Sequence, residues 1–559
     1  MNRFFFNNSR EAHHFPLLGG LRGASHFPLL GGLRGAFNGS SFRLLLVVVM
    51  ATVVFNSCKK SNGGNEPVSP DQLTITGFSP THALVGETVT ITGTAFTAAT
   101  TVAFNGIAVT NIESVTATQL KAVVPVGATT GKIQLADNGK TAVSAADFTV
   151  DIPPTPKAPV IDWAKALGGD EDEKANCVRQ TTDGGYIVAG YTASNKGDFA
   201  GNHGNWDLWV VKLKSAGEIE WQKLIGGADN DYANAIQQTT DGGYIVAGST
   251  ANVSSNYDLW VVKLKSDGNI DWQKTFGGSG NEYAYSVQQT KDGGYIVSGS
   301  TSSINGDVTL NHGADDLWVI KLKSDGNYEW KQTYGGTGFD AAKSIQQTAD
   351  GGYIVAGSTN STNGDFSVNH GGYDFWVLKL KSDGSVEWQK LYGGANDDVA
   401  NSIQQTADGG YIVAGYTNSN NQDVSGNHGS YDFWVVKLKS AGDVDWKKVY
   451  GGTGSEQANS VQQTTDGGYI VAGYTVSNDG DVKGFHGPAG FFDYWVIKIG
   501  ATGSLQWQMA LGGTNDDRAN AIQQTKDGGY IVAGYAASSD NDVMANHGKN
   551  DFWVVKLKN

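Results

Sequence analysis

The chain has 559 residues, which is long for one ordinary domain and predicts two or more. It contains 76 glycines and only 11 prolines, a balance that indicates many tight turns between short strands rather than a disordered, proline-rich chain. The formal net charge is −15 at pH 7, and an acidic protein lacks the basic face that nucleic-acid binding requires. We therefore expect no nucleic acid among its partners.

Residues 1–57 are interpreted as a signal peptide with an upstream extension. The segment 14–25 is repeated almost unchanged at 26–37, which has no evident structural role and suggests a wrongly assigned start codon, so residues 1–41 are excluded from the fold argument. After Arg43 comes an apolar run of about a dozen residues, the length of a signal h-region rather than of a transmembrane span of ~20 residues.

The stretch "FRLLLVVVMATVVFNSCKK" (42–60) resembles a bacterial lipoprotein signal peptide. The resemblance implies that Cys58 is diacylated and becomes the mature N-terminus, with an uncleaved membrane anchor as the alternative. It also implies a membrane partner through the lipid. We expect an outer-membrane lipoprotein on the periplasmic or cell-surface side, because Lys59 rather than Asp follows the cysteine.

Residues 58–72 are polar and predict a tether. From 73 to 150, Val, Thr and Ile alternate between Gly and Pro, which predicts short strands. The elements Ser-Pro, "GETVTITG", Phe-Asn-Gly and Val-Pro-x-Gly occur here in an order that resembles the IPT/TIG immunoglobulin-like domain. The resemblance implies a small β-sandwich that acts as a spacer or attachment module. Residues 151–160, "DIPPTPKAPV", predict a semi-rigid linker.

A repeat covers 161–559. Its tryptophans are spaced by 58, 51, 58, 58, 58 and 61 residues and are Trp163, Trp221, Trp272, Trp330, Trp388, Trp446 and Trp507. Such a period predicts a propeller or a solenoid. The hairpin signals "DGG" and "SDGN" place the pieces "IQQT", "YIVAGYT", "WVVKLK" and the following "EWQK" in one four-stranded antiparallel blade.

The two ends of the repeat array are complementary. The chain ends on the third strand of the last blade and enters the array on a lone Trp strand, which can complete that blade as a strap. A solenoid would need polar capping repeats, and none is visible. The prediction is an all-β fold: a seven-bladed β-propeller of four-stranded blades with strap closure, preceded by an Ig-like β-sandwich. The motif "GGYIVAGYT" and its neighbours also resemble the bacterial SBBP repeat, which implies a secreted or surface propeller without a general catalytic motif.

Residues that recur in every unit are interpreted as structural, because an active site breaks symmetry. They include an acid before the inner strand, an Asp before the Trp-Val strand, and a Lys within that strand; one turn His occurs in six units. We expect the carboxylates to bond loop N–H groups or to pair with the lysines. The histidines show no metal-ligand spacing, so we expect no metal and no cofactor. Cys177 is expected to be a small buried residue.

The longer, variable connections emerge on one face and predict a binding face there. Its aromatic residues are interpreted as candidate ligand contacts, with local loop packing as the alternative: Trp206, Tyr257, Tyr373, Tyr431 and Phe491. Aromatic rings among Asn and Asp suit stacking on sugars, and Trp206 lies outside the two regular tryptophan positions.

The predicted function is non-enzymatic binding of an extracellular glycan or protein by a monomer. The alternatives are a propeller-based glycan lyase or hydrolase and a purely structural envelope component. An enzyme should carry a blade-specific cluster of catalytic side chains. The only arginines in the repeat array are Arg179 and Arg518, and the sequence gives neither an evident partner.

Overall fold

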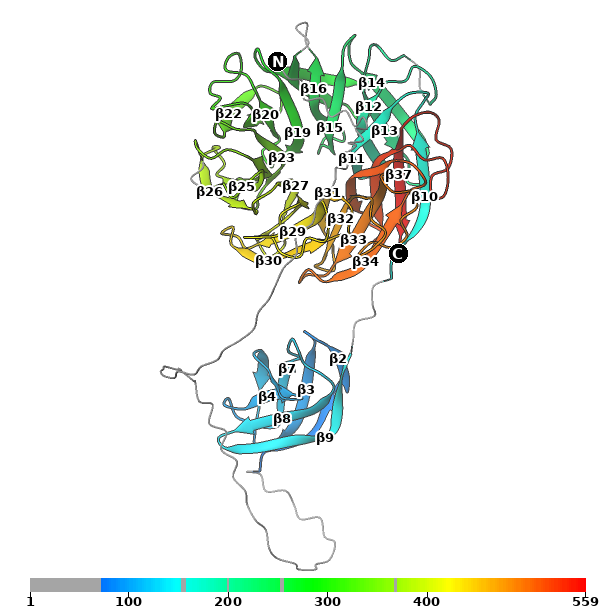
Figure 1. The fold of residues 1–559 in the computed structure, drawn as a ribbon. Coiled ribbons are helices and arrows are strands. Elements are labelled where there is room, and N and C mark those ends of the chain that lie inside the picture. The colour runs from blue at the N-terminus through cyan, green and yellow to red at the C-terminus, as the bar shows by residue number, and fades with distance from the viewer. Residues whose placement is uncertain (1–71, 152–156, 199–200, 252–255, 366–368) are drawn as a thin grey trace, which may run out of the picture. The chain divides into compact units, whose positions relative to one another are not determined.

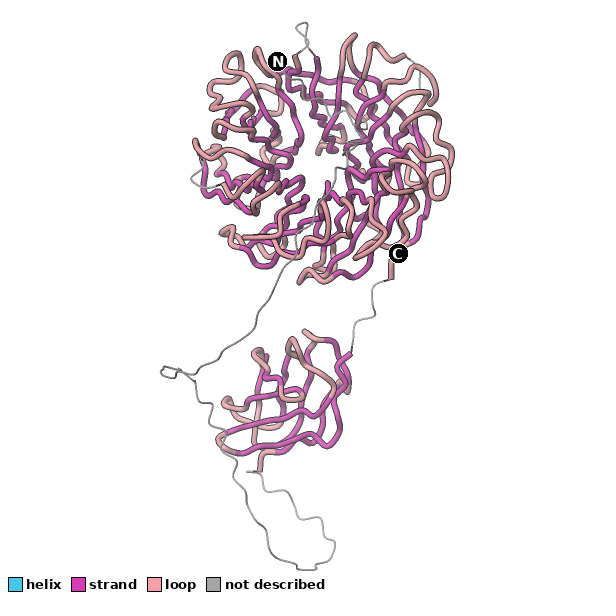
Figure 2. Tube along the Cα trace, in the orientation of Figure 1, coloured by secondary structure: helices cyan, strands magenta, loops and turns pink. Residues whose placement is uncertain are grey.

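A computed structural model describes residues 72–151, 157–198, 201–251, 256–365 and 369–559. Cys58 and the predicted signal peptide lie outside the described residues. The chain divides into two units, Met1–Asp151 and Ile152–Asn559, a division at the start of the predicted linker. Strands and loops make up the described parts of both units (Figure 2), and these parts contain no helix long and apolar enough to cross a membrane.

The described part of the first unit is a sandwich of two sheets. One sheet has the order β1 (Thr74–Ser79), β3 (Thr88–Thr94), β7 (Gln119–Val123), β6 (Ile112–Val115). The other has the order β2 (His82–Leu84), β9 (Lys140–Asp151), β8 (Gly131–Asp137), β4 (Thr101–Phe104), β5 (Ile107–Ala108). Alternate residues of β3 point inward, and the rings of Phe104 and Phe148 meet at 4.9 Å in the core. The predicted β-sandwich is confirmed.

The described part of the second unit forms seven four-stranded antiparallel sheets arranged around a centre (Figure 1). The first sheet is β11 (Glu173–Gln180), β12 (Tyr186–Thr192), β13 (Asp207–Leu213), β14 (Ile219–Ile225); the second is β15 (Asp231–Gln238), β16 (Tyr244–Ala251), β17 (Tyr257–Leu264), β18 (Ile270–Phe276); the third is β19 (Glu282–Gln289), β20 (Tyr295–Thr301), β21 (Asp316–Leu322), β22 (Tyr328–Tyr334).

The fourth sheet is β23 (Asp340–Gln347), β24 (Tyr353–Thr359), β25 (Asp374–Leu380), β26 (Val386–Tyr392); the fifth is β27 (Asp398–Gln405), β28 (Tyr411–Thr417), β29 (Asp432–Leu438), β30 (Val444–Tyr450). The sixth is β31 (Glu456–Gln463), β32 (Tyr469–Thr475), β33 (Asp493–Ile499), β34 (Leu505–Leu511); the last is β35 (Asp517–Gln524), β36 (Tyr530–Ala536), β37 (Asp551–Lys558), β10 (Val160–Leu167). The four strands of each predicted blade therefore lie in one sheet.

The inner hairpin of each sheet turns at the repeated "DGG". In the first sheet, the Asp183 carboxylate accepts hydrogen bonds from the Thr181 hydroxyl and the Gly185 N–H. Gly184 has a φ of 86°, a left-handed conformation that favours glycine. This local chemistry explains why the turn recurs with the same residues.

Aromatic side chains pack each sheet against the next. A tryptophan of each outer strand meets a tyrosine of the following sheet edge-to-face at 5.6–5.9 Å, as in Trp163–Tyr186 and Trp221–Tyr244. The second regular tryptophan is buried as well, and Trp209 packs on Phe552 of the neighbouring sheet. The predicted packing role of the regular tryptophans is confirmed, and Cys177 is buried as expected.

Glutamine side chains join the inner strands. The second Gln of each "QQ" pair accepts a hydrogen bond at 2.8–2.9 Å from a backbone N–H of the preceding sheet. The first Gln accepts one at 2.6–2.7 Å from the following sheet, in six of the seven sheets. In the first sheet Arg179 takes this position, and a guanidinium carries no acceptor.

The last sheet combines both ends of the unit, since β10 pairs with β37 from Val160↔Lys558 to Leu167↔Phe552. The last and first sheets are also in contact. Trp209 and Phe552 lie 4.4 Å apart between ring centroids, and Gln180 N–H donates to Gln523 at 2.7 Å.

Removal of β10 tests how far the unit depends on it. We expect a fragment 168–559 to lose several kcal/mol of unfolding free energy relative to a fragment 157–559, because deletion strips a strand from a packed sheet and exposes the edge of β37. The measurement is urea unfolding of both fragments. Equal stability of the two would show that the pairing of β10 with β37 contributes nothing to the array.

Candidate binding face

The buried acids of the repeat stabilise loops. The acid that begins each inner strand accepts a hydrogen bond at 2.7–2.9 Å from a glycine N–H four residues earlier, as in Glu173 with Gly169. In six sheets the histidine ring lies 2.6–3.0 Å from the buried Asp that begins the third strand. The described residues contain no group of three or more side chains that could hold a metal ion.

The regular lysines pair elsewhere. Of the two roles expected for the buried acids, bonding to loop N–H groups is the one observed, because each buried lysine instead reaches the Asp of the "DGG" turn at 2.9–3.0 Å, as Lys212 does with Asp183. Lys212 also contacts Glu220 on the next strand at 3.0 Å. The lysine lies at the opposite end of its strand from the Asp that begins it, so the strand's own length keeps the two apart.

Aromatic rings form a continuous arc across the first three sheets. The ring centroid of Tyr191 lies 5.0 Å from that of Trp206 and 4.8 Å from that of Tyr232. The ring centroids of Tyr232 and Tyr257 are 5.9 Å apart. The chain of contacts continues from Tyr257 to Tyr283 at 5.4 Å.

The arc ends beside the inner strand of the fourth sheet. Tyr283 and Tyr285 stack at 6.4 Å, and the Lys343 ammonium lies 3.6 Å from the centre of the Tyr285 ring. The aromatic arc is thus defined by half-buried rings that each keep some surface exposed: Tyr191, Trp206, Tyr232, Tyr257, Tyr283 and Tyr285.

Burial governs the electrostatics of the arc. It raises the pKa of Tyr232 well above the ordinary value, with neighbouring Tyr257 adding to the effect, and it raises the pKa of Tyr191 and Tyr283 in the same direction. The phenols of Tyr191, Tyr232 and Tyr283 are therefore neutral at physiological pH. The Asn230 amide donates to the Tyr257 hydroxyl at 2.9 Å, so polar groups flank the rings.

The predicted contacts fall into two groups. Trp206 and Tyr257 belong to the aromatic arc. Tyr431 lies apart in the fifth sheet, where it meets Tyr416 at 5.3 Å, and Tyr373 is half-buried before β25. Phe491 is half-buried, and its N–H donates to the Pro488 carbonyl at 3.3 Å.

Position in the repeat identifies residues that the loop argument missed. The residue after the inner-strand acid differs in every sheet except the second and third: Lys174, Tyr232, Tyr283, Ala341, Val399, Gln457 and Arg518. It lies between a recurrent acid and an invariant Ala, so a comparison of the seven units at this position could have found Tyr232 and Tyr283. Tyr285 and Lys343 stand where the other five units have Asn.

Arg518 lies in a second aromatic cluster. Its guanidinium is 4.0 Å from the Phe492 ring centre and 4.9 Å from that of Tyr474. Phe492, rather than Phe491, occupies the position that Tyr257 has in the second sheet. The arginine without an evident partner in the sequence is thus held between rings.

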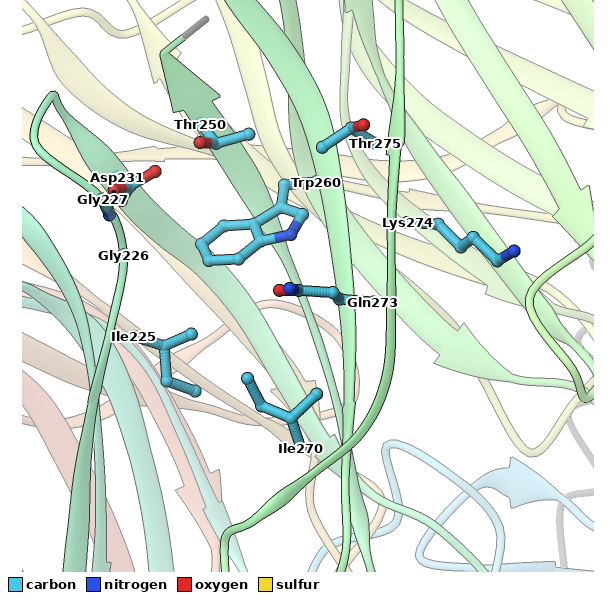
Figure 3. Close-up of a pocket in the computed structure, with 10 residues that line it drawn as sticks. All are labelled: Ile225, Gly226, Gly227, Asp231, Thr250, Trp260, Ile270, Gln273, Lys274 and Thr275. Carbon is cyan, nitrogen blue, oxygen red and sulfur yellow. Dashed lines mark hydrogen bonds between the residues drawn. The ribbon is translucent and has the colours of Figure 1, made fainter.

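A cavity of about 430 Å³ lies between the first and second sheets (Figure 3), with Ile225 of the first sheet and Trp260 and Lys274 of the second among its lining residues. The connection between β16 and β17 spans only residues 252–256, whereas that between β12 and β13 spans 193–206. Trp260 keeps 6% of its surface exposed, against 0% for Trp209.

Comparison with known proteins gives a family for one segment. Residues 73–150 match the family model described as IPT/TIG domain. The chain is 24% identical over 355 residues to the Regulatory protein FlaEY of Caulobacter vibrioides. That match covers 56% of this chain and 36% of the relative, so the chain spans well under two thirds of that protein.

Several solved structures are similar in fold. The Pan2 WD40 domain of Neurospora crassa is 11% identical with a TM-score of 0.41, over 72% of this chain and 98% of that one. An auxiliary nutrient binding protein from Bacteroides thetaiotaomicron is 10% identical with a TM-score of 0.32, over 88% and 99%. BamB from Moraxella catarrhalis is 11% identical with a TM-score of 0.33, over 72% and 100%. The β-propeller fold of the second unit rests on its own sheets around a centre, and these low scores carry no argument.

The buried acids predict how stability depends on pH. Burial raises the pKa of Asp517 to about 7, whereas an Asp in an unfolded chain has a pKa of about 3.9. Between these values the folded protein binds a proton that the unfolded chain releases, so this contribution to stability is complete below pH ~4 and is lost as pH rises through 7. We expect the unfolding free energy to fall between pH 5 and pH 8, and Asp517→Asn to reduce that fall by roughly 1–3 kcal/mol.

Asp241 provides the matched control. Burial alone would raise its pKa, but hydrogen bonds from Thr239, Lys263 and the Gly243 N–H outweigh burial and lower the pKa to about 2. Its contribution is present above pH ~4 and is lost as pH falls toward 2. Asp241→Asn should leave the difference between pH 5 and pH 8 unchanged in urea unfolding. An unaltered difference in Asp517→Asn would contradict the assignment.

Proposed function

We propose that this chain is a non-enzymatic envelope lipoprotein whose propeller binds an extracellular glycan, with the aromatic arc as the contact surface. In this proposal the lipid at Cys58 anchors the chain in the outer membrane, the 58–72 tether and the IPT/TIG domain act as spacers, and the propeller is a monomeric binding module. The observation that carries the proposal is the arc of six contacting aromatic rings.

We further propose that the seven sheets are the blades of a closed ring, with β10 as the strap. Two observations support closure. The contacts between the last and first sheets are of the same kinds as those between all other neighbours, including the Gln180–Gln523 hydrogen bond and the Trp163–Tyr186 packing. A closed ring also leaves no sheet exposed at an end of the array.

Binding rather than catalysis is favoured by the chemistry of the face. The recurrent acids and histidines are engaged in bonds that repeat from sheet to sheet. In the described residues the arc offers phenols, an indole and one lysine, whose Nζ lies against the Tyr285 ring. Neutral phenols of raised pKa are poor general bases at physiological pH, so the lyase or hydrolase alternative lacks a catalytic pair here.

A glycan is favoured over a protein by the shape of the arc. The C–H faces of sugar rings pack on aromatic rings, while their hydroxyls need amides and other polar groups nearby. The arc supplies both along a row of contacting rings, with Asn230 beside Tyr257. A protein partner would instead be expected to bury a broad patch of about 800 Å² on this surface. Tyr373, Tyr431 and Phe491 remain proposed outer contacts.

The test is a glycan-array screen of the fragment 157–559, followed by affinity measurements on variants. We expect Trp206→Ala and Tyr257→Ala each to weaken binding of the glycan found by roughly 10- to 30-fold, because truncation of an aromatic anchor costs about 2 kcal/mol. The comparison variant is Tyr431→Ala, which removes a proposed outer contact at the equivalent position of the fifth sheet, away from the arc, and should weaken binding less than threefold.

Melting temperatures separate packing from recognition. If Trp206→Ala lowers the melting temperature but leaves affinity intact, Trp206 is a packing residue and the arc is not the site. Equal losses of glycan affinity in all three variants would instead assign binding to the whole face that carries the long connections, rather than to the arc.

The lipid anchor is tested by fractionation. We expect Cys58→Ala to release the protein from membranes into the soluble fraction, because the mature chain would then carry no acyl chains. The measurement is the distribution of wild type and variant between membrane and soluble fractions, with Cys177→Ala as the matched control that keeps the anchor. Retention of Cys58→Ala in the membrane would contradict lipidation.

A further inference from the structure

A cavity of about 220 Å³ lies on the axis of the second unit, lined by the innermost strands of all seven sheets. Its lining side chains are chiefly amides and hydroxyls: Gln237, Gln288, Gln346, Gln404, Gln462, Gln523, Ser286, Ser344, Ser402 and Ser460. Arg179 completes the ring of glutamines and is the one charged residue among the described residues that line the cavity. None of the lining residues is an acid.

The hydrogen bonds between sheets fix the orientation of these amides. Each of the six glutamines accepts a backbone N–H through Oε1 at 2.6–2.7 Å, and only the oxygen of an amide can accept. The Nε2 atoms of the six have no hydrogen-bond partner in the described parts of the chain. Their two N–H donors each are therefore available to the cavity.

The serine hydroxyls also accept a hydrogen bond between sheets and keep their O–H groups as donors. Each accepts a backbone N–H of the following sheet through Oγ at 3.2–3.3 Å, as Ser286 does from Ile345, which leaves its O–H to donate. One lone pair of each of these oxygens is thus used between sheets, while the side-chain donors remain. Free donors therefore outnumber free acceptors in the lining, which suits an acceptor-only ligand better than a cation.

Arg179 is only partly engaged. Its one hydrogen bond to a described residue runs from Nη1 to its own neighbour, the Val178 carbonyl, at 3.0 Å. No carboxylate of the described residues forms an ion pair with it. A guanidinium has five N–H donors in a planar fork that matches an oxyanion in a bidentate way.

We propose that the axial cavity binds a small oxyanion, a phosphate, sulfate or carboxylate group, on Arg179 and the surrounding amide and hydroxyl donors. An acceptor-only ligand with negative charge complements a lining of donors with one positive charge. The volume equals that of about seven water molecules at ~30 Å³ each, which accommodates a tetrahedral anion with some hydration. The site is independent of the aromatic arc and stands whether or not the arc binds a glycan.

Two sources could supply this chemistry: a free inorganic ion or the acidic group of a sugar. Calorimetric titration of the full chain at constant ionic strength with inorganic phosphate, inorganic sulfate and glucuronate distinguishes them, with glucose as the neutral match for glucuronate. We expect saturable binding of at least one of the three anions, and no binding of glucose that depends on Arg179. Absence of binding of all three anions at millimolar concentrations would overturn the proposal.

The chain offers a matched variant. Arg179→Gln places at this position the residue that the other six sheets already have, so we expect its melting temperature to equal or exceed that of wild type. The new Oε1 can accept from the Gln238 N–H, as its counterparts do. We expect anion affinity to fall at least tenfold in this variant.

Arg518→Gln removes the same charge from a residue stacked on Phe492 and Tyr474 and should leave anion affinity unchanged. Equal affinity in Arg179→Gln and wild type, or an equal loss in both variants, would refute the site.

Discussion

The glutamine hydrogen bonds between inner strands are the interaction on which the second unit depends. An inner strand has a ladder partner on one side only, so its other edge carries backbone N–H groups that need acceptors. A glutamine side chain is long enough to reach the next sheet and supplies the required oxygen. Gln346 accepts from the Gln405 N–H, and Gln347 accepts from the Lys291 N–H on the other side. Each sheet is thereby tied to both neighbours.

This constraint explains which positions repeat and which vary. The glutamines, the "DGG" turns and the tryptophan–tyrosine pairs recur because each sheet must present the same surfaces to its neighbours. Positions outside these contacts can differ from sheet to sheet. Tyr285 and Lys343 replace the asparagine that elsewhere donates to the next sheet, as Asn401 does to the Ala458 carbonyl. Arg179 replaces a glutamine. Departures from the repeat therefore mark the aromatic arc and the axial cavity.

The sequence allowed much of the fold to be predicted. Hairpin signals placed four strands in each sheet, and the unpaired Trp163 strand indicated the pairing of the two ends, because these inferences depend on local turn chemistry and on strand period. The hydrogen-bond and ion-pair partners of individual side chains were harder to predict from the sequence. Pairing of the buried acids with the regular lysines stayed open beside bonding to loop N–H groups, since sequence regularity does not say which end of a strand a long side chain reaches. Trp206 and Tyr257 were selected from loop composition, but the rings that connect them lie on regular strands, where alternation predicts burial.

Hydrogen exchange tests the central claim, that glutamines tie every neighbouring pair of sheets including the last and the first. The backbone N–H groups of Gln180 and Lys526 lie at the junction of those two sheets, and those of Gln347 and Lys291 lie at an internal junction. We expect similarly slow exchange at both junctions, with faster exchange at Gln238, where Arg179 offers no acceptor. Fast exchange at Gln180 and Lys526 beside slow exchange at Gln347 and Lys291 would contradict it.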